Sequence, residues 1–201
     1  MNGIVLFSGI NYSGKSTVLG IVKEDFVGAR FETLSRLMME RSKVDGHIGL
    51  SHVDPQTRNS IRRSVLTDIS DESKRQAIFL DSHFVFEDGE KSDFSIISRD
   101  VKSVVLIKPD PENILSRALN DDKISLHPGR SSLKDLGFIK SYLDEEEKTA
   151  KEYIDISYET TGQRIDFVVV RNNIVGLDNL RKEISLVTPI IKKSLLDRFT
   201  Y

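Results

Sequence analysis

The residues best suited to chemistry lie at positions 9–17, which read GINYSGKST. This segment fits the pattern G-x-x-x-x-G-K-[ST] without a mismatch. Its two glycines let successive backbone N–H groups point inward, and the positive end of a following helix adds to the attraction for phosphate. Lys15 is expected to reach the β- and γ-phosphates of a nucleotide, and Ser16 to place its hydroxyl on Mg²⁺. The segment predicts a P-loop that holds ATP through Gly9, Asn11, Ser13, Gly14, Lys15, Ser16 and Thr17.

A P-loop site also needs a carboxylate near the metal, at the end of a neighbouring strand. Asp81 directly follows the apolar run at 77–80, so it is the expected metal-side carboxylate. His83 lies two residues further on, at the same expected edge of the sheet, where it could contact the phosphate of the substrate. The alternatives are that Asp81 caps the following turn and that His83 fills a polar niche.

The elements that must position these residues follow from alternating short β-rich runs and longer helical stretches. This alternation predicts a three-layer α/β/α sandwich around a parallel sheet. The run at 145–148 (EEEK) is expected on the exposed surface of its helix. The expected strands are 4–7, 29–32, 77–80, 103–107 and 165–170, and the expected helices are 15–26, 33–43, 55–75, 111–119, 136–158 and 177–195, the last broken at Pro189.

Two polar stretches, at 45–52 and 120–134, show no helical or strand periodicity. Both are long for connections in a compact domain. Such excursions are either surface loops or lids and flaps that cover a binding site.

Composition bounds the function further. A length of 201 residues suits one domain, here predicted to be a single P-loop kinase domain over 1–201. The 29 basic and 31 acidic residues give a net charge of −2, which argues against binding long nucleic acids. The lack of cysteine excludes disulfides, thiolate zinc sites and cysteine nucleophiles. No apolar run is long enough to span a membrane, and no basic region precedes the run at 4–7, so we expect a cytoplasmic protein. The sequence does not determine its oligomeric state.

The P-loop class contains switches, motors and kinases. The tetrapeptide N-K-x-D, with which GTP switches read guanine, does not occur in the sequence. Motors and AAA-type machines need a longer chain. A compact P-loop chain with two polar excursions favours a kinase of small molecules, because such enzymes use lids to keep water from the γ-phosphate.

Several segments resemble the archaeal-type adenylate kinases, a branch of the nucleoside monophosphate kinases. Besides the P-loop, they are 31–33 (FET), 53–57 (VDPQT) and 80–83 (LDSH), the last two being similar to L-D-P-x-T and V-D-T-H in that family. The resemblance implies a five-stranded parallel sheet of order 2-3-1-4-5, with a helical acceptor-binding flap at 33–75 and a lid segment at 118–135. It implies the conversion of ATP and AMP into two ADP, with ATP and Mg²⁺ bound and a nucleotide as the small-molecule partner.

The resemblance also implies roles for single residues. Thr33 matches a residue that meets the base or ribose of the acceptor nucleotide. Arg117 matches the arginine that leads into the lid, and it is expected to join Lys15 in offsetting charge on the transferred phosphoryl group. Asn172 and Asn173 match the loop that holds the ATP adenine.

The chain departs from this family in its cations. The lid residues at 119–123 read LNDDK, and the basic residues expected before Asp54 and after His83 are missing. Arg36, Arg58 and Arg62 could replace them in binding the acceptor, or could be plain surface. Two other functions therefore stay open. One is a P-loop kinase of another nucleotide or of a small hydroxyl compound, with Asp81 or His83 as the base, and the other is a non-catalytic ATP-binding regulatory module.

Overall fold

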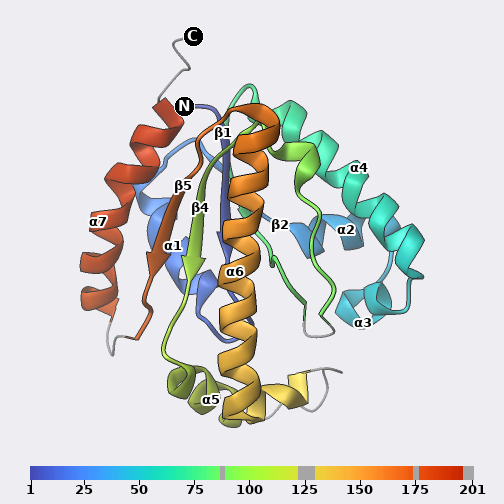
Figure 1. Cartoon of the computed structure of the whole chain (residues 1–201), viewed down its shortest axis with the longest axis vertical. Coiled ribbons are helices and arrows are strands. Elements are labelled where there is room, and N and C mark those ends of the chain that lie inside the picture. The colour runs from blue at the N-terminus through green and yellow to red at the C-terminus, as the bar shows by residue number, and fades with distance from the viewer. Residues whose placement is uncertain (87–88, 122–129, 174–176, 197–201) are drawn as a thin grey trace.

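A five-stranded parallel sheet forms the centre of the molecule (Figure 1). The computed structural model describes residues 1–86, 89–121, 130–173 and 177–196, without the side chains of 47 and 48. The strand order, β2-β3-β1-β4-β5, confirms the prediction. The strands are β1 (Gly3–Ser8), β2 (Arg30–Thr33), β3 (Ala77–Asp81), β4 (Val101–Ile107) and β5 (Asp166–Val170).

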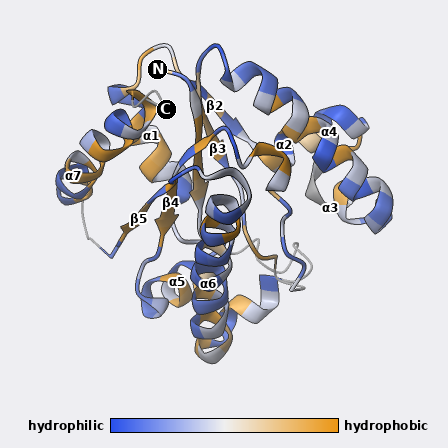
Figure 2. Cartoon of the chain, turned by 45° about the horizontal axis from the view of Figure 1, so that its top comes forward, coloured by the Kyte–Doolittle hydropathy of each residue, from blue (hydrophilic) through white to orange (hydrophobic). Residues whose placement is uncertain are grey.

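Helices cover both faces of the sheet, which confirms the three-layer sandwich. On one face, β1 and β3 to β5 pack against α1 (Lys15–Asp25) and α7 (Leu177–Leu196). On the other face, the core includes side chains of α2 (Leu34–Ser42), α4 (Pro55–Ser73), α5 (Pro111–Leu119) and α6 (Leu136–Thr161). Figure 2 shows the apolar strands enclosed between these layers. No helix in the described ranges is long and apolar enough to cross a membrane.

Residues 45–52 were expected to form a loop, but they contain the short helix α3 (Gly46–Ser51). Leu50 of this helix is buried in the core, and its packing stabilises a helix that is too short to show a periodic pattern in the sequence. In the predicted lid segment at 118–135, the described part contains the end of α5 and the 3₁₀ helix η3 (Arg130–Lys134), while 122–129 lie outside the described residues. A second 3₁₀ helix, η1 (Ser95–Ile97), precedes β4.

Pro189 was expected to break the last helix, but α7 continues through it. A proline inside a helix leaves the carbonyl four residues earlier without its N–H donor. That carbonyl belongs to Ser185, and both Ser185 and Pro189 are exposed. Water can therefore satisfy the carbonyl, so the helix tolerates the proline.

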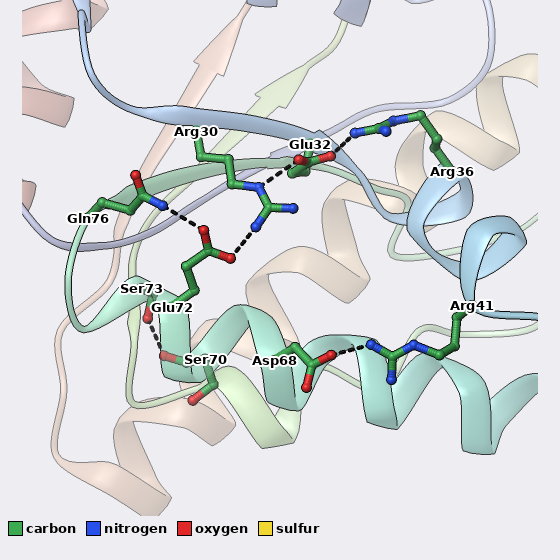
Figure 3. A network of polar contacts seen from close by, with 9 residues as sticks. All are labelled: Arg30, Glu32, Arg36, Arg41, Asp68, Ser70, Glu72, Ser73 and Gln76. Carbon is green, nitrogen blue, oxygen red and sulfur yellow. Dashed lines mark hydrogen bonds and ion pairs between the residues drawn. The ribbon is translucent and has the colours of Figure 1, made fainter.

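Ion pairs fasten the helices of the 33–75 segment to the sheet edge. Arg30 of β2 lies between Glu32, at 2.6 Å, and Glu72 of α4 (Figure 3). Arg41 of α2 pairs with Asp68 of α4. Such partly exposed pairs contribute little individually, about 0–1 kcal/mol each. Together they define how the two long helices of this segment sit against β2.

Candidate active site

The loop between β1 and α1 has the backbone geometry that its glycines make possible. Gly9, Tyr12 and Gly14 have φ values of 145°, 63° and 86°. A Cβ on Gly9 would lie 2.5 Å from the carbonyl oxygen of Ile107 in β4, closer than a side chain can approach. The loop therefore lies directly on the carboxyl end of the neighbouring strand, as a P-loop requires.

Lys15 is the first residue of α1, and its side chain folds back over the loop. Its ammonium donates to the carbonyl oxygens of Gly9, at 2.5 Å, and Ile10, at 3.4 Å. Lys15 is only 8% exposed. The neighbouring Ser13 hydroxyl is buried and finds no hydrogen-bond partner among the described residues. A cation and an unpartnered hydroxyl thus lie within one short loop.

The remaining predicted residues of the P-loop lie around this cation. Asn11 is half-buried within the loop, whereas Ser16 and Thr17 are exposed in the first turn of α1. The N–H of Thr17 donates to the carbonyl of Gly14 at 3.1 Å, which begins the helix. The Ser16 hydroxyl is therefore available at the positive end of α1, where an oxygen ligand for a metal was predicted.

Two segments far along the chain, which contain Arg117 and Asn172, contact the backbone of this loop at Tyr12 and Ser13. The Arg117 guanidinium donates to the carbonyl of Tyr12 at 2.9 Å and to that of Asn172 at 3.1 Å. The Asn172 amide in turn donates to the carbonyl of Ser13 at 3.0 Å. Burial lowers the pKa of Arg117 from its ordinary value. The structure thus brings Arg117 and Asn172 to the P-loop, while their roles toward ATP stay predictions.

Asn173 follows Asn172 in the loop after β5, and it contacts the turn before α5. Its side-chain oxygen accepts a hydrogen bond from the backbone N–H of Asp110. This contact fixes the loop after β5 to the turn that leads into α5, the helix of Arg117. Asn173 was predicted to hold the adenine, and its described contact is a structural one.

Tyr12 adds a contact that the sequence did not indicate. Its hydroxyl donates to a carboxylate oxygen of Asp121 at 2.7 Å. Burial and the carboxylate both raise the pKa of Tyr12. Asp121 lies just after α5, in the segment predicted to be a lid, so the P-loop and this segment touch directly.

The expected metal-side carboxylate lies at the carboxyl edge of the sheet. Asp81 ends β3, and its neighbours in register are Phe7 of β1 and Thr33 of β2. Burial raises the pKa of Asp81, while the charge of Lys15 opposes this shift. The structure therefore places Asp81 beside Thr33 on the neighbouring strand, although the two residues were predicted from separate segments. It also places Asp81 where the charge of Lys15 acts on it.

An arginine pair lies next to the segment that follows Asp81. Arg58 and Arg62 of α4 both bind the carboxylate of Glu90, at 2.5 and 3.1 Å. The Arg62 guanidinium also covers the ring of Phe86, 5.1 Å from its centroid, and that ring lies 6.1 Å from the ring of His83. These contacts connect the half-buried His83 to the arginine pair.

Arg36, the third predicted acceptor cation, has different surroundings. Its guanidinium contacts Glu32 of β2 (Figure 3). It also contacts Glu40 of α2 at 2.6 Å. Arg36 thus belongs to the ion-pair network at the sheet edge, and its described partners are carboxylates.

Sequence reasoning missed Glu146. The run at 145–148 was expected on the surface, yet Glu146 of α6 is completely buried, at 0% exposure. Its carboxylate accepts hydrogen bonds from the N–H groups of Phe84, at 3.0 Å, and Val85, at 2.7 Å, and from the Ser8 hydroxyl. Burial raises its pKa. The sequence did carry a signal for this burial: the helical spacing places position 146 on the same face as the buried residues at 139, 142, 143 and 150.

Comparison with known proteins agrees with this geometry. A family profile described as AAA domain (AAA_17) matches residues 8–129, which is more than half of the chain. No curated protein matches it. Shikimate kinase from Bacteroides thetaiotaomicron superposes with a TM-score of 0.63 at 14% identity, over 96% of this chain and 99% of that one.

Two further shikimate kinases show the same likeness. The one from Acinetobacter baumannii, solved in complex with shikimate, gives a TM-score of 0.59 at 12% identity, over 96% of this chain and 95% of that one. The one from Aquifex aeolicus gives 0.56 at 18% identity, over 96% and 99%. The superpositions establish a shared fold, whereas sequence identities this low leave the substrate open.

The family match corrects one inference and refines another. Chain length was taken to argue against AAA-type machines, but length limits an assembled machine and not the domain that the profile describes. The expected resemblance to adenylate kinases is confirmed at the level of a P-loop kinase-type fold, and specificity for AMP stays a prediction. The chain belongs to the AAA domain family of P-loop proteins, with a fold that the shikimate kinases share.

Proposed function

We propose that this protein is a kinase that transfers the γ-phosphoryl group of ATP to a hydroxyl group of a small molecule. The observation that carries this proposal is that Glu90 already occupies Arg58 and Arg62 and offsets one of their two positive charges. A doubly charged monophosphate acceptor needs cations that are available to hold it and offset its charge. A hydroxyl acceptor instead needs a base, and Asp81, the last residue of β3, is the residue that we propose for this role.

The nucleotide side fits the phosphates of ATP. Lys15 supplies a buried cation, Ser13 a hydroxyl with no partner among the described residues, and Gly9 a close backbone approach that a Cβ would block. Mg²⁺ would be held by the hydroxyl of Ser16, and when bound it would neutralise charge on the β- and γ-phosphates. No group of three His, Cys, Asp or Glu side chains in the described ranges is arranged for a metal, so the phosphates would supply the other ligands.

In the proposed transfer, the acceptor hydroxyl gives its proton to Asp81 while its oxygen bonds to the γ-phosphorus. The bond from that phosphorus to the bridging oxygen breaks, and ADP leaves. Lys15 and Arg117 offset the charge that develops, and Thr33 orients the acceptor beside Asp81. Because burial raises the pKa of Asp81, the carboxylate is a better proton acceptor than an exposed aspartate. Residues 33–75 serve as the acceptor flap and 118–135 as the lid.

An acceptor screen tests the proposal. Purified protein with Mg-ATP is given a panel of hydroxyl metabolites, nucleosides and nucleoside monophosphates, and ADP formation is compared with an acceptor-free control. Turnover that depends on a hydroxyl compound supports the proposal. Silence with every acceptor, with ATP still bound, contradicts it and favours the regulatory module.

The conversion of ATP and AMP into two ADP is the second candidate, and one observation favours it. Arg58 and Arg62 converge on a single carboxylate, so together they already form an anion site. The phosphate of AMP could take the place of Glu90 there, because a guanidinium pair suits phosphate as well as carboxylate. Strong turnover with AMP alone in the same screen would replace the hydroxyl proposal by this one.

A further inference from the structure

The segment that follows Asp81 is held by one helix. Val85 donates its N–H to Glu146 at 2.7 Å, and its carbonyl accepts from the Tyr142 hydroxyl at 3.0 Å. Phe84 donates its N–H to the same carboxylate at 3.0 Å. Tyr142 and Glu146 lie four residues apart, one turn along the buried face of α6. Side chains of α6 thus satisfy the backbone that leaves β3.

The same carboxylate also reaches the strand before the P-loop. Ser8, the last residue of β1, donates its hydroxyl to Glu146 and immediately precedes Gly9. The N–H of Ser82 donates to the carbonyl of Phe7 at 3.0 Å, which fastens the two strand ends to each other. Glu146 therefore joins the beginning of the P-loop to the segment that contains Asp81 and His83.

A buried carboxylate is an unfavourable choice for packing alone. Removing it from water costs free energy that an apolar side chain of similar size would not cost. What a carboxylate offers here is two acceptor oxygens that can bind several donors at once. The attraction of the Lys15 charge lowers the cost of keeping it ionised. Its specific contribution is therefore to orient donors, two of which are backbone N–H groups next to the site.

We propose that Glu146 is a positioning residue that fixes the 81–85 segment against the P-loop and thereby sets Asp81 relative to Lys15. This inference rests on the proposed function for its catalytic consequence. Its structural consequence can be measured without catalysis.

The test compares Glu146→Gln with the wild-type protein. Glutamine keeps the shape but turns an NH₂ group toward donors, so at least one of them loses its acceptor. We expect kcat to fall at least about tenfold while the KM for ATP changes less than about threefold, because the loop that holds ATP is intact. Hydrogen exchange at the amides of Phe84 and Val85 should accelerate at least about tenfold. Tyr142→Phe, which loses one hydrogen bond, should shift both readouts in the same direction by less.

Glu159→Gln is the matched control, since Glu159 is exposed near the other end of α6. It should leave kcat and exchange at 84–85 unchanged. An unchanged kcat in Glu146→Gln, or a loss of kcat, ATP affinity and thermal stability in proportion, overturns the inference. If the wild-type protein transfers phosphate to no acceptor, the proposed function falls, and amide exchange alone decides the role of Glu146. Unchanged exchange at 84–85 then overturns it.

Discussion

Gly14 and Asn172 lie so close that a Cβ on the glycine would come within 2.1 Å of the asparagine Nδ2. That amide is occupied in holding the carbonyl of Ser13 at 3.0 Å. The same hypothetical Cβ would also lie 3.4 Å from the Arg117 guanidinium. Gly14 is therefore required by its neighbours as well as by its backbone conformation, and the P-loop depends on a residue near the C-terminal end of the chain.

Gly14→Ala should lose both stability and ATP affinity. Gly28 is a matched control, because its φ of 87° nearly equals the 86° of Gly14, while a Cβ there would meet no atom of the described residues within 4 Å. Each alanine should cost about 1–2 kcal/mol of unfolding free energy from its left-handed backbone, and Gly14→Ala should cost more because of the collision. Urea unfolding and calorimetric ATP binding measure the two effects. Equal losses in both variants would show that Asn172 moves aside freely.

Lys15→Ala should reduce turnover at least about a hundredfold, as for other preorganised charge contacts. The physical reason is the loss of the buried cation that is proposed to bind the γ-phosphate. Steady-state ADP formation with the acceptor found in the screen measures it, and Lys23→Ala on the exposed side of the same helix is the control. Near-normal turnover in Lys15→Ala would remove Lys15 from the mechanism.

Asp81→Asn should lose at least about a hundredfold in turnover but gain thermal stability at neutral pH. Because burial raises the folded-state pKa of Asp81, the group favours folding below its unfolded-state pKa, and this contribution is lost as the pH rises through the folded-state pKa. At pH 7 the charged carboxylate therefore lowers stability, and asparagine avoids this cost. Melting curves should show the gain at pH 7 shrink as the pH falls toward the ordinary aspartate pKa. A gain that is the same at every pH would contradict the shifted pKa.

Glu90→Gln should widen the acceptor range toward anions. Removing the charge of Glu90 leaves both charges of Arg58 and Arg62 available to an acceptor, so the KM for AMP or another anionic acceptor should fall about tenfold. The control is Asp93→Asn, which changes the exposed partner of Arg63 in the same part of the structure. If both variants treat anionic acceptors as the wild-type protein does, Glu90 does not guard the arginine pair.

Much of the fold could be predicted because its signals are local. The continuous apolar run at 77–80 predicts a buried strand, and Asp54 before Pro55 predicts the start of α4, where the Asp54 side chain does accept from the N–H of Thr57 at 2.9 Å. The P-loop is predictable for the same reason, since one short segment contains its glycines, its lysine and its hydroxyls. The order of the strands came from the family resemblance, because apolar runs alone do not specify which strands pair.

The charge state of the site could not be predicted, because it depends on pairs far apart in the sequence. Arg62 and Glu90 are 28 residues apart, and Ser8 and Glu146 are 138 apart. Composition described Arg58 and Arg62 as basic residues on a helix and Glu146 as one of three consecutive glutamates. Only the packing of α4 and α6 shows that the two arginines share the carboxylate of Glu90 and that Glu146 is buried.

The hydrogen bond between Ser13 and Asn172 joins residues 159 positions apart, so the order of synthesis matters to the nucleotide site. A ribosome makes the P-loop first, but the residues that close its nucleotide side belong to α5 and to the loop after β5. Until about residue 173 has left the exit tunnel, the growing chain has the phosphate-binding motif without its complete surroundings. Binding of ATP should therefore report that the nascent chain has emerged to about residue 173, and ATP can stabilise the nucleotide site only after that point.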